Sequence, residues 1–286
     1  MVNILITGAK SFVGTSVEQW LQQWSTDYAV DTVDTMNDKW RDSDFAKYDV
    51  VFHVAGIAHV DPKPEMAPLY YKVNRDLTIE IARYAKECGV KQFVFMSSMI
   101  VYHASKSLKG VVIKAKTAPN PNDFYGDSKL QAENGLKQLS SNEFRVAILR
   151  PCMIYGSKGK GNFQRLARLA TRTPIFPEWH NKRSMLYIDN LCEFVKQAID
   201  RGLDGIFHLQ NREFADTVMI VKHYAKSANH KLFCSRLLNP LVYIGALVLK
   251  PLCKMFANQY YAQELTTFDF EYQIVSFEES LKLIKL

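Results

Sequence analysis

Short apolar runs alternate along the first half of the chain with longer segments whose apolar residues recur every three or four positions. Continuous apolar runs are typical of strands buried on both faces, and the longer spacing is typical of amphipathic helices. The pattern therefore predicts an α/β fold, a doubly wound parallel sheet with helices on both faces. The expected strands are 3–7, 28–34, 49–54, 92–97 and 144–150, and the expected helices are 12–24, 70–87 and 123–138.

The pattern loosens after residue 151, where Gly and Pro interrupt residues 155–177 and short elements follow. We therefore expect residues 1–155 to form the sheet domain, to which some later segments return, and residues 156–286 to form mainly a smaller lobe. Residues 237–255 are strongly apolar, although two prolines and a lysine break the run. A buried helical hairpin is the favoured interpretation of this segment, and docking on a membrane surface is the alternative.

Composition excludes several classes of protein. The 286 residues are 48% hydrophobic and 23% charged, which excludes a disordered or fibrous chain. No apolar run is long enough for a membrane span, and the start MVNILITGAK lacks the basic region of a secretory signal. Five scattered cysteines without a CxxC pair indicate the reduced thiols of a cytoplasmic protein. The net charge of +7 suits an anionic partner, but no Lys/Arg cluster indicates nucleic acid.

The first candidate site follows the first strand and opens the first helix. Glycines at such a turn let the backbone approach a pyrophosphate, and the helix N-terminus supplies N–H groups. Ser11 stands where the GxxGxxG spacing has its middle glycine. The candidate residues for binding a dinucleotide are Gly8, Lys10, Ser11, Phe12, Val13 and Gly14.

Asp34 ends the second expected strand, twenty residues after Gly14. An acid at this place can bind both ribose hydroxyls of NAD and repel the 2′-phosphate of NADP. Asp31 is the alternative acid, whereas the cation Lys10 would favour an extra phosphate. The balance favours NAD as the cofactor and leaves NADP open.

Tyr125 and Lys129 are four residues apart on an expected helix, so they share one face. A phenol titrates at about 10, and a neighbouring ammonium lowers that pKa. Tyr125 can then exchange a proton with a substrate hydroxyl. Ser97 and Ser98 end a strand, where a hydroxyl can hydrogen-bond the reacting oxygen.

Together these motifs resemble the extended short-chain dehydrogenase/reductase superfamily, and more closely its nucleotide-sugar epimerase/dehydratase branch. The resemblance implies that Tyr125 is the acid/base, that Lys129 is its partner and also binds the nicotinamide ribose, and that Ser98 holds the reacting oxygen. The matching stretches are 6–14, 50–60, 71–98, 125–129, 149–156 and 183–190, in that order.

The same resemblance implies further contacts. A guanidinium suits a diphosphate because it can bind two oxygens at once. The resemblance further implies that residues 1–155 bind the dinucleotide and that residues 156–286 mainly bind substrate. It also implies that the chain dimerises through helices 70–87 and 123–138. The implied residues are Val54, Ala55, Gly56, Asn74 and Pro151 for the cofactor, and Asn162 and Arg183, with Ser98 and Tyr125, for the sugar nucleotide.

Some residues depart from the family pattern or carry no expected chemistry. Met99 and Ile100 stand where dehydratases of this branch have an Asp-Glu pair, so a 4,6-dehydratase is not expected. His53 and His59 lie near a strand end, but too few other ligands converge there for a metal. Asp189 is expected to be structural.

The combined expectation is an NAD-dependent UDP-sugar 4-epimerase that acts through a transient 4-keto sugar in polysaccharide precursor synthesis. An NAD(P)-dependent nucleotide-4-keto-sugar reductase or dehydrogenase is the alternative, because it uses the same side chains. A non-catalytic dinucleotide-binding regulator is a remote alternative, since a fold does not determine a function.

Overall fold

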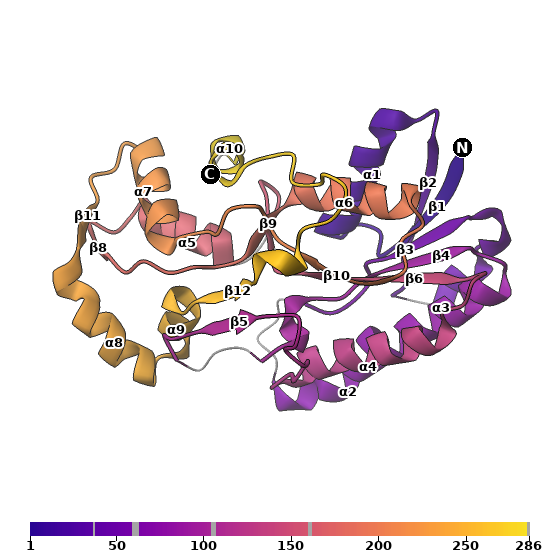
Figure 1. Ribbon diagram of the computed structural model, residues 1–286, viewed down its shortest axis with the longest axis horizontal. Coiled ribbons are helices and arrows are strands. Elements are labelled where there is room, and N and C mark those ends of the chain that lie inside the picture. The colour runs from indigo at the N-terminus through magenta and orange to yellow at the C-terminus, as the bar shows by residue number, and fades with distance from the viewer. Residues whose placement is uncertain (37, 59–62, 104–106, 160–161, 285–286) are drawn as a thin grey trace.

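A computed structural model describes residues 1–36, 38–58, 63–103, 107–159 and 162–284. Its centre is a six-stranded parallel sheet with the order β2-β1-β3-β4-β6-β10 (Figure 1). The chain leaves β1 in one direction for β2 and then crosses to the other side for β3, so the order reverses beside β1. The strands are β1 (Val2–Thr7), β2 (Tyr28–Val33), β3 (Val50–His53), β4 (Gln92–Met96), β6 (Arg145–Pro151) and β10 (Gly205–Leu209).

Helices cover both faces of this sheet, which confirms the predicted doubly wound architecture (Figure 1). On one face lie α1 (Phe12–Leu21) and α6 (Ile188–Asp200), which pack against each other. On the other face lie α3 (Leu77–Glu87) and α4 (Phe124–Leu139). The helix expected over 70–87 is divided in three: α2 (Ala67–Tyr70), a π-helical segment (Tyr71–Asp76) and α3.

The C-terminal third forms the smaller lobe and also sends β10 back to the sheet edge beside β6. A second link is the parallel pair β5–β12, which joins residues 111–113 to residues 259–261. The apolar runs did not indicate this pairing. The remaining elements are β5 (Val111–Ile113), β7 (Met153–Tyr155), α5 (Asn162–Ala170), β8 (Ile175–Pro177), β9 (Met185–Tyr187), α7 (Thr217–Ser227), β11 (Phe233–Ser235), α8 (Asn239–Val248), α9 (Lys250–Phe256), β12 (Gln259–Tyr261) and α10 (Phe277–Leu283).

The apolar segment 237–255 does form two helices, α8 and α9, which approach closely at Gly245 and Leu252. The expectation that this hairpin is buried is wrong for α8. Val242 is buried in this helix, but Leu241 beside it is 64% exposed. Periodicity cannot distinguish an apolar face that meets the core from one that meets solvent.

Within the described residues, no helix combines the length and the apolar character that crossing a membrane requires.

A buried ion pair joins α4 to the sheet. Glu133 on α4 accepts hydrogen bonds from Arg150 on β6, at 3.0 Å from Nε and 2.5 Å from Nη2. The Ser97 hydroxyl donates to Glu133 at 2.5 Å, and Arg150 Nη1 donates to the Tyr102 hydroxyl at 2.6 Å. Tyr102 in turn lies 2.7 Å from Nε2 of His208 on β10. Burial and the Arg150 charge lower the pKa of His208 to about 4, so its ring is neutral at neutral pH.

We predict that Glu133→Gln lowers the free energy of unfolding by about 3 kcal/mol, because the Arg150 charge loses its buried counter-charge. Urea unfolding at neutral pH measures the change. The matched control is Glu278→Gln, which breaks an exposed pair with Lys282 on α10 and is expected to leave the unfolding midpoint unchanged. Equal effects of the two substitutions would contradict the structural role of the buried pair.

Candidate active site

The turn after β1 brings the backbone of two strands into close contact. Gly8 has φ +96°, which favours glycine, and its N–H donates to Val33 O at 3.0 Å. A Cβ at Gly8 would lie only 2.8 Å from Ala55 N, just beyond β3. A Cβ at Gly14 would lie 2.7 Å from Ser11 Oγ. The turn therefore needs both glycines, and it lies where the strand order reverses, the usual ligand position in such sheets.

Ser11 replaces the middle glycine without strain, since its φ is −71°. Its hydroxyl caps α1 by accepting from Gly14 N at 2.9 Å. Lys10 takes the left-handed conformation instead, with φ 71°, and its side chain is exposed. The Phe12 ring packs under the loop after β7, and Val13 lies partly buried against the core.

The structure separates the two candidate acids of β2. Asp34 is exposed directly after Val33, whose carbonyl accepts from the glycine turn, and its Oδ1 accepts from Met36 N at 2.9 Å. Asp31 is engaged elsewhere, since its carboxylate accepts from Tyr48 at 2.6 Å and pairs with Lys47 at 3.3 Å. Asp34 is therefore the better placed of the two.

The start of α4 presses against the loop after β4. Asp123 caps the helix, with its Oδ1 accepting from Gly126 N at 2.7 Å. A Cβ at Gly126 would lie 2.5 Å from Ile100 O, so the helix can approach this closely only with glycine. The approach brings Tyr125 to Ser98, whose side chains hydrogen-bond each other.

The pKa of Tyr125 is raised to about 12, mainly by burial and further by Tyr70 and Asp123. The expected lowering by Lys129 is wrong for this structure. Lys129 Nζ donates instead to Met96 O at 2.9 Å and lies 4.7 Å from the centre of the Phe95 ring. Tyr125 is consequently a protonated phenol at neutral pH.

Lys129 and Asn74 flank the loop after β3. A Cβ at Gly56 would lie 3.2 Å from Lys129 Nζ and 2.9 Å from Asn74 Oδ1. Asn74 accepts from Ile57 N at 2.8 Å and donates to Ile57 O at 3.2 Å. Its amide therefore fixes the backbone of this loop. Burial lowers the pKa of Lys129 to about 8, and Glu133 opposes that shift.

His53 belongs to a buried structural network and not to a ligand set. Its ring nitrogens lie 2.7 Å from Thr7 Oγ1 and 3.0 Å from Thr78 Oγ1. Burial lowers its pKa to about 3. Among the described residues no group of three His, Cys, Asp or Glu side chains can hold a metal ion. His59 lies outside the described residues.

Comparison with known proteins identifies the family of the chain. The model of the NAD dependent epimerase/dehydratase family matches residues 4–208. A UDP-glucose 4-epimerase of Vibrio cholerae is 31% identical over 246 residues, which cover 78% of this chain and 75% of that protein. The chain belongs to this family.

Further similarities are more distant. The N-acetyl-alpha-D-glucosaminyl-diphospho-ditrans,octacis-undecaprenol 4-epimerase of Escherichia coli O157:H7 is 26% identical over 277 residues, covering 90% of this chain and 82% of that one. A UDP-glucuronic acid 4-epimerase from Bacillus cereus, solved with NAD, superposes with TM-score 0.73 at 18% identity, over 99% of this chain and 97% of that chain. A dTDP-4-dehydrorhamnose reductase from Bacillus anthracis, solved with NADP, gives TM-score 0.73 at 19% identity, over 99% and 98%. At these identities the two structures support the fold alone.

Pro151, which was expected to bind the cofactor, ends β6 and is buried. Arg183 and Asn162, which were expected to bind the sugar nucleotide, follow β6 in the chain. Arg183 donates from Nη1 to the Lys254 carbonyl in the last turn of α9, and its charge acts on the neighbouring thiol of Cys152. Asn162 begins α5, but its side chain lies outside the described part of the structure.

Sequence reasoning missed two residues that contribute to the site: Tyr70, whose ring packs on Tyr125, and Glu133, whose charge acts on Lys129. The Tyr70 ring lies 5.8 Å from the Tyr125 ring, edge to face. Glu133 lies four residues after Lys129, so the spacing that linked Tyr125 to Lys129 also places this acid on the same face of α4. The signal was therefore present in the sequence.

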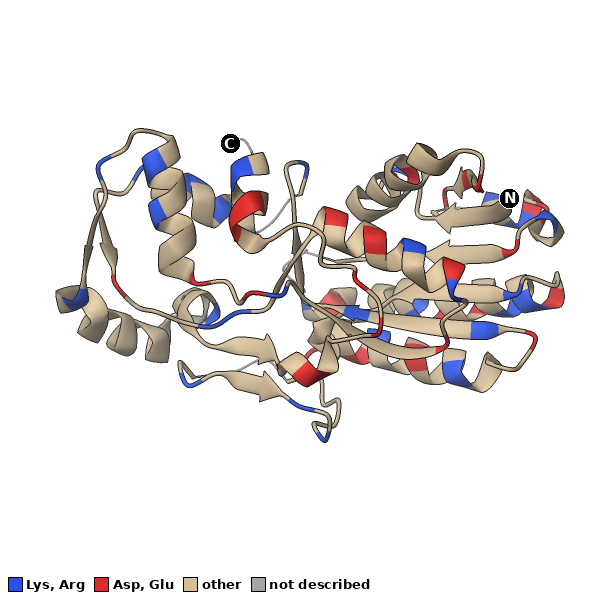
Figure 2. Cartoon of the chain, turned by 45° about the horizontal axis from the view of Figure 1, so that its top comes forward, with Lys and Arg blue, Asp and Glu red and all other residues tan. Residues whose placement is uncertain are grey.

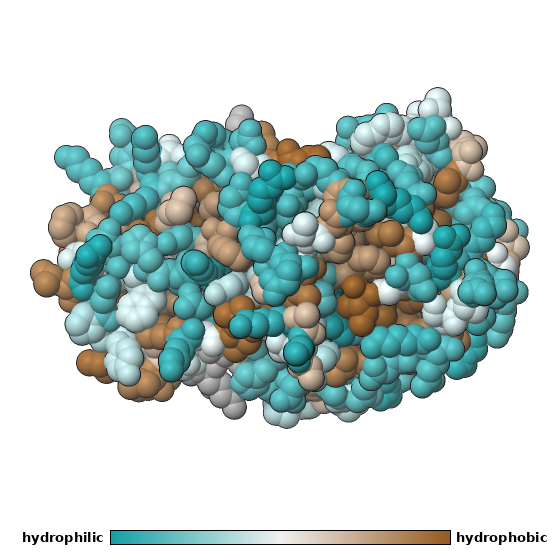
Figure 3. Space-filling model, in the orientation of Figure 1, coloured by the Kyte–Doolittle hydropathy of each residue, from teal (hydrophilic) through white to brown (hydrophobic). Residues whose placement is uncertain are grey.

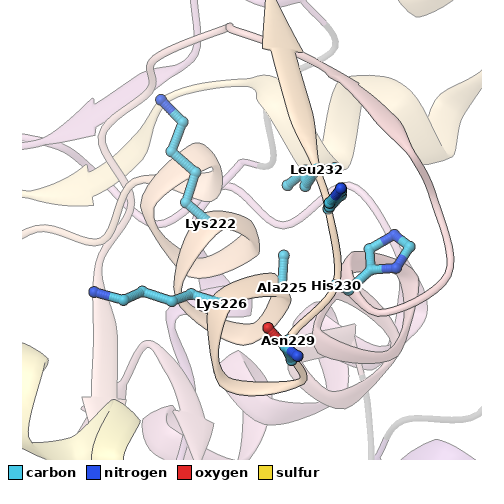
Figure 4. Close-up of a pocket in the computed structure, with 7 residues that line it drawn as sticks. Lys222, Ala225, Lys226, Asn229, His230 and Leu232 are labelled. Carbon is cyan, nitrogen blue, oxygen red and sulfur yellow. The ribbon is translucent and has the colours of Figure 1, made fainter.

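A shallow depression of about 290 Å³ lies at the C-terminal end of α7 in the lobe. Figure 4 shows the side chains of Lys222 and Lys226 extending away from Ala225 and Leu232, so the two ammonium groups do not converge. Lys222 pairs with Glu178 at 3.2 Å. The residues that line this depression include none of the candidate catalytic residues, and we assign the depression no part in catalysis.

We predict that Gly8→Ala weakens NAD binding by at least about tenfold and lowers the unfolding midpoint, because its Cβ would collide with Ala55 N. Gly89→Ala is the matched control, since Gly89 has a similar φ of +84° but no atom within 4 Å of its added Cβ. Calorimetric titration with NAD and urea unfolding measure the two effects. Equal losses of affinity in both variants would contradict a specific close approach at Gly8.

We predict that Lys129→Met is more stable than the wild type near neutral pH, by at most about 3 kcal/mol. The folded pKa of Lys129, about 8, lies below its usual value, so the folded protein carries a penalised charge at lower pH. Between about pH 8 and pH 10 the wild type sheds that proton and the stability gap narrows. Urea unfolding of both proteins across this range checks the prediction, and a pH-independent gap would contradict it.

Proposed function

We propose that this protein is an NAD-dependent nucleotide-sugar 4-epimerase whose substrate is a UDP-sugar. The observation that carries the proposal is that Tyr125 contacts Ser98 after β4, while Lys129, one turn further along α4, reaches the Gly56 loop after β3. The family supports the reaction class, and the name of the Vibrio cholerae relative supports the sugar nucleotide.

The residues present fit a dinucleotide. Gly8, Gly14 and Gly56 are three of the positions where an added Cβ would collide with the chain's own atoms, so the backbone after β1 and the backbone after β3 pack closely at the edge where the dinucleotide would lie. In the proposal the glycine turn and the start of α1 hold the pyrophosphate, and Asp34 holds the adenosine ribose. Val54–Gly56 line the adenine side, Lys129 binds the nicotinamide ribose, and Pro151 faces the nicotinamide. The bound nicotinamide supplies the hydride chemistry at C4 of the sugar.

Tyr125 moves the proton that accompanies this chemistry. In the proposal it takes the proton of the C4 hydroxyl and later returns it, while Ser98 holds the oxygen through a hydrogen bond. A pKa of about 12 keeps Tyr125 protonated at neutral pH, so it holds a proton to donate but is seldom ionised to accept one. Acting as a base requires a positive charge near the phenol, and Lys129 is one helical turn away.

A second candidate function is the reduction of a nucleotide-4-keto-sugar with NAD(P)H. The protonated Tyr125 favours it, because reduction of the ketone needs only an acid. An epimerase would leave the cofactor in its starting state after each cycle, whereas a reductase would have to exchange it. The two candidates therefore differ in whether the cofactor leaves.

In this proposal residues 1–155 bind the dinucleotide and residues 156–286 mainly bind substrate, with Arg183 and Asn162 at the diphosphate. The chain is proposed to form a homodimer through α3 and α4 and to work in the cytoplasm in polysaccharide precursor synthesis. The name of the Escherichia coli relative adds a polyprenyl-diphosphate-linked sugar as an alternative substrate class.

We predict that Tyr125→Phe lowers turnover of UDP-glucose by about a thousandfold while NAD still binds, because the substitution removes only the hydroxyl that carries the proton. Tyr71→Phe is the control, since the Tyr71 hydroxyl bonds to Asp127 on the outer side of α4 and its loss is expected to leave turnover unchanged. A coupled assay for UDP-galactose measures the rates. Unchanged turnover in Tyr125→Phe would contradict the role of Tyr125 as acid/base, and absence of turnover from the wild type would favour the non-catalytic regulator.

The dinucleotide carried through purification separates the epimerase from the reductase. The protein is purified without added nucleotide and denatured, and the released dinucleotide is identified by mass spectrometry. An equimolar amount of NAD supports the epimerase. Its absence, together with oxidation of added NADPH in the presence of a 4-keto sugar nucleotide, supports the reductase.

A further inference from the structure

The helix α8 presents its apolar face outward. Leu237, Leu241, Ile244 and Val248 follow one another at intervals of four, three and four residues, which places them on one helix face. Their exposed fractions are 89%, 64%, 61% and 79%. In a helix that packs on a protein core, a face of this kind points inward. Here only Val242 is buried and Gly245 faces Leu252 of α9, whereas Tyr243 and Leu247 are exposed as well.

The apolar surface continues onto the neighbouring strands. Phe233 on β11 and Ile175 on β8 are direct partners in register and are 66% and 53% exposed. Figure 1 shows α8 beside these strands, at the end of the lobe farthest from the large sheet. Figure 3 shows brown side chains along the same lower left edge of the molecule. We call Ile175, Phe233, Leu237 and the exposed residues of α8 the apolar end.

The segment of the chain that carries α8 contains basic but no acidic residues. Residues 217–263 contain no Asp or Glu, and their basic residues are Lys222, Lys226, Lys231, Arg236, Lys250 and Lys254. Arg236 precedes α8 and is 81% exposed, whereas two of the lysines follow the helix in sequence. Figure 2 shows α8 without any charged residue and with a blue segment at its end near β8 and β11.

We propose that the apolar end docks on the surface of an anionic lipid bilayer. The α8 face enters the region between headgroups and acyl chains, and the flanking basic side chains bind lipid phosphates. Ten residues of α-helix extend about 15 Å, half of the roughly 30 Å hydrocarbon core, so α8 lies in the plane of the interface. The docking is independent of the reaction assigned to the protein.

The charge pattern favours lipid over a second copy of this chain. Two apolar ends facing each other would bring Arg236 and its neighbouring lysines close to their own equivalents, and the acid-free segment offers no counter-charge. Glu178, the nearby acid, is already engaged by Lys222 and Arg236 at 3.2 and 3.7 Å. An anionic headgroup layer supplies the missing negative charge.

Co-sedimentation of the full chain with lipid vesicles tests the proposal. Vesicles of phosphatidylglycerol and phosphatidylcholine are expected to bind the protein about tenfold more tightly than phosphatidylcholine alone. Raising the salt from about 0.1 M to about 0.5 M is expected to weaken binding several-fold. A protein that stays in the supernatant with the anionic vesicles would overturn the proposal.

Two pairs of variants locate the surface. Leu241→Gln/Ile244→Gln/Val248→Gln is expected to reduce vesicle binding at least about tenfold, whereas Leu69→Gln/Leu283→Gln changes exposed apolar residues elsewhere and leaves binding intact. Arg236→Glu is expected to weaken binding to anionic vesicles, and Lys137→Glu on α4 is its control. Unchanged binding of the triple variant would overturn the assignment to α8.

Two further measurements distinguish lipid docking from self-association and from a loss of folding. Analytical ultracentrifugation measures the oligomeric state of the wild type and the triple variant. A wild-type dimer that dissociates in the triple variant, together with no binding of the wild type to vesicles, would assign the face to a second copy and overturn the proposal. Urea unfolding and turnover of a soluble nucleotide sugar are expected to match the wild type in all four variants. If turnover is absent from the wild type as well, the proposed reaction fails while the vesicle result stands.

Discussion

The position of the candidate catalytic helix depends on the buried ion pair between Glu133 and Arg150. A buried charge pair is tolerated only when its hydrogen-bonding capacity is met inside the protein. Arg150 meets this condition with bonds to Glu133 and Tyr102, and Glu133 also accepts from Ser97. These bonds join α4 to the ends of β4 and β6, so the helix face that carries Tyr125 and Lys129 has one position over the sheet edge.

Burial controls the charge states around this pair. It raises the pKa of Tyr125 and lowers that of Lys129, so both groups are driven toward their neutral forms. Glu133 opposes the effect on Lys129, one helical turn away. A lysine whose pKa lies near the working pH can change its charge during a reaction, whereas an ordinary surface lysine cannot. A buried lysine of this kind lowers the free energy of unfolding, and such a loss of stability is common at reactive sites.

Sequence patterns predicted the parts of the molecule that local periodicity determines. The five strands of the first half lie within two residues of their expected bounds, because continuous apolar runs mark strands buried on both faces. Strand ends pointed to Ser97 and Ser98 alike, and the family resemblance singled out Ser98 as the partner of Tyr125. The pairing of β5 with β12 could not be predicted, because it joins segments far apart in the chain. Nor could spacing reveal that Lys129 Nζ bonds to the Met96 carbonyl, since that depends on the shape of the buried pocket.

The hairpin of α8 and α9 connects the apolar end to the candidate substrate side. Gly245 lets α8 lie against Leu252 of α9, so the two helices pack as one unit. The last turn of α9 also accepts the hydrogen bond of Arg183 through the Lys254 carbonyl. The guanidinium has five N–H donors, so a bond from Nη1 to a carbonyl leaves the Nε and Nη2 donors in a geometry that can bind two oxygens of a diphosphate. The backbone of the seven-residue α9 thereby positions Arg183 on the candidate substrate side.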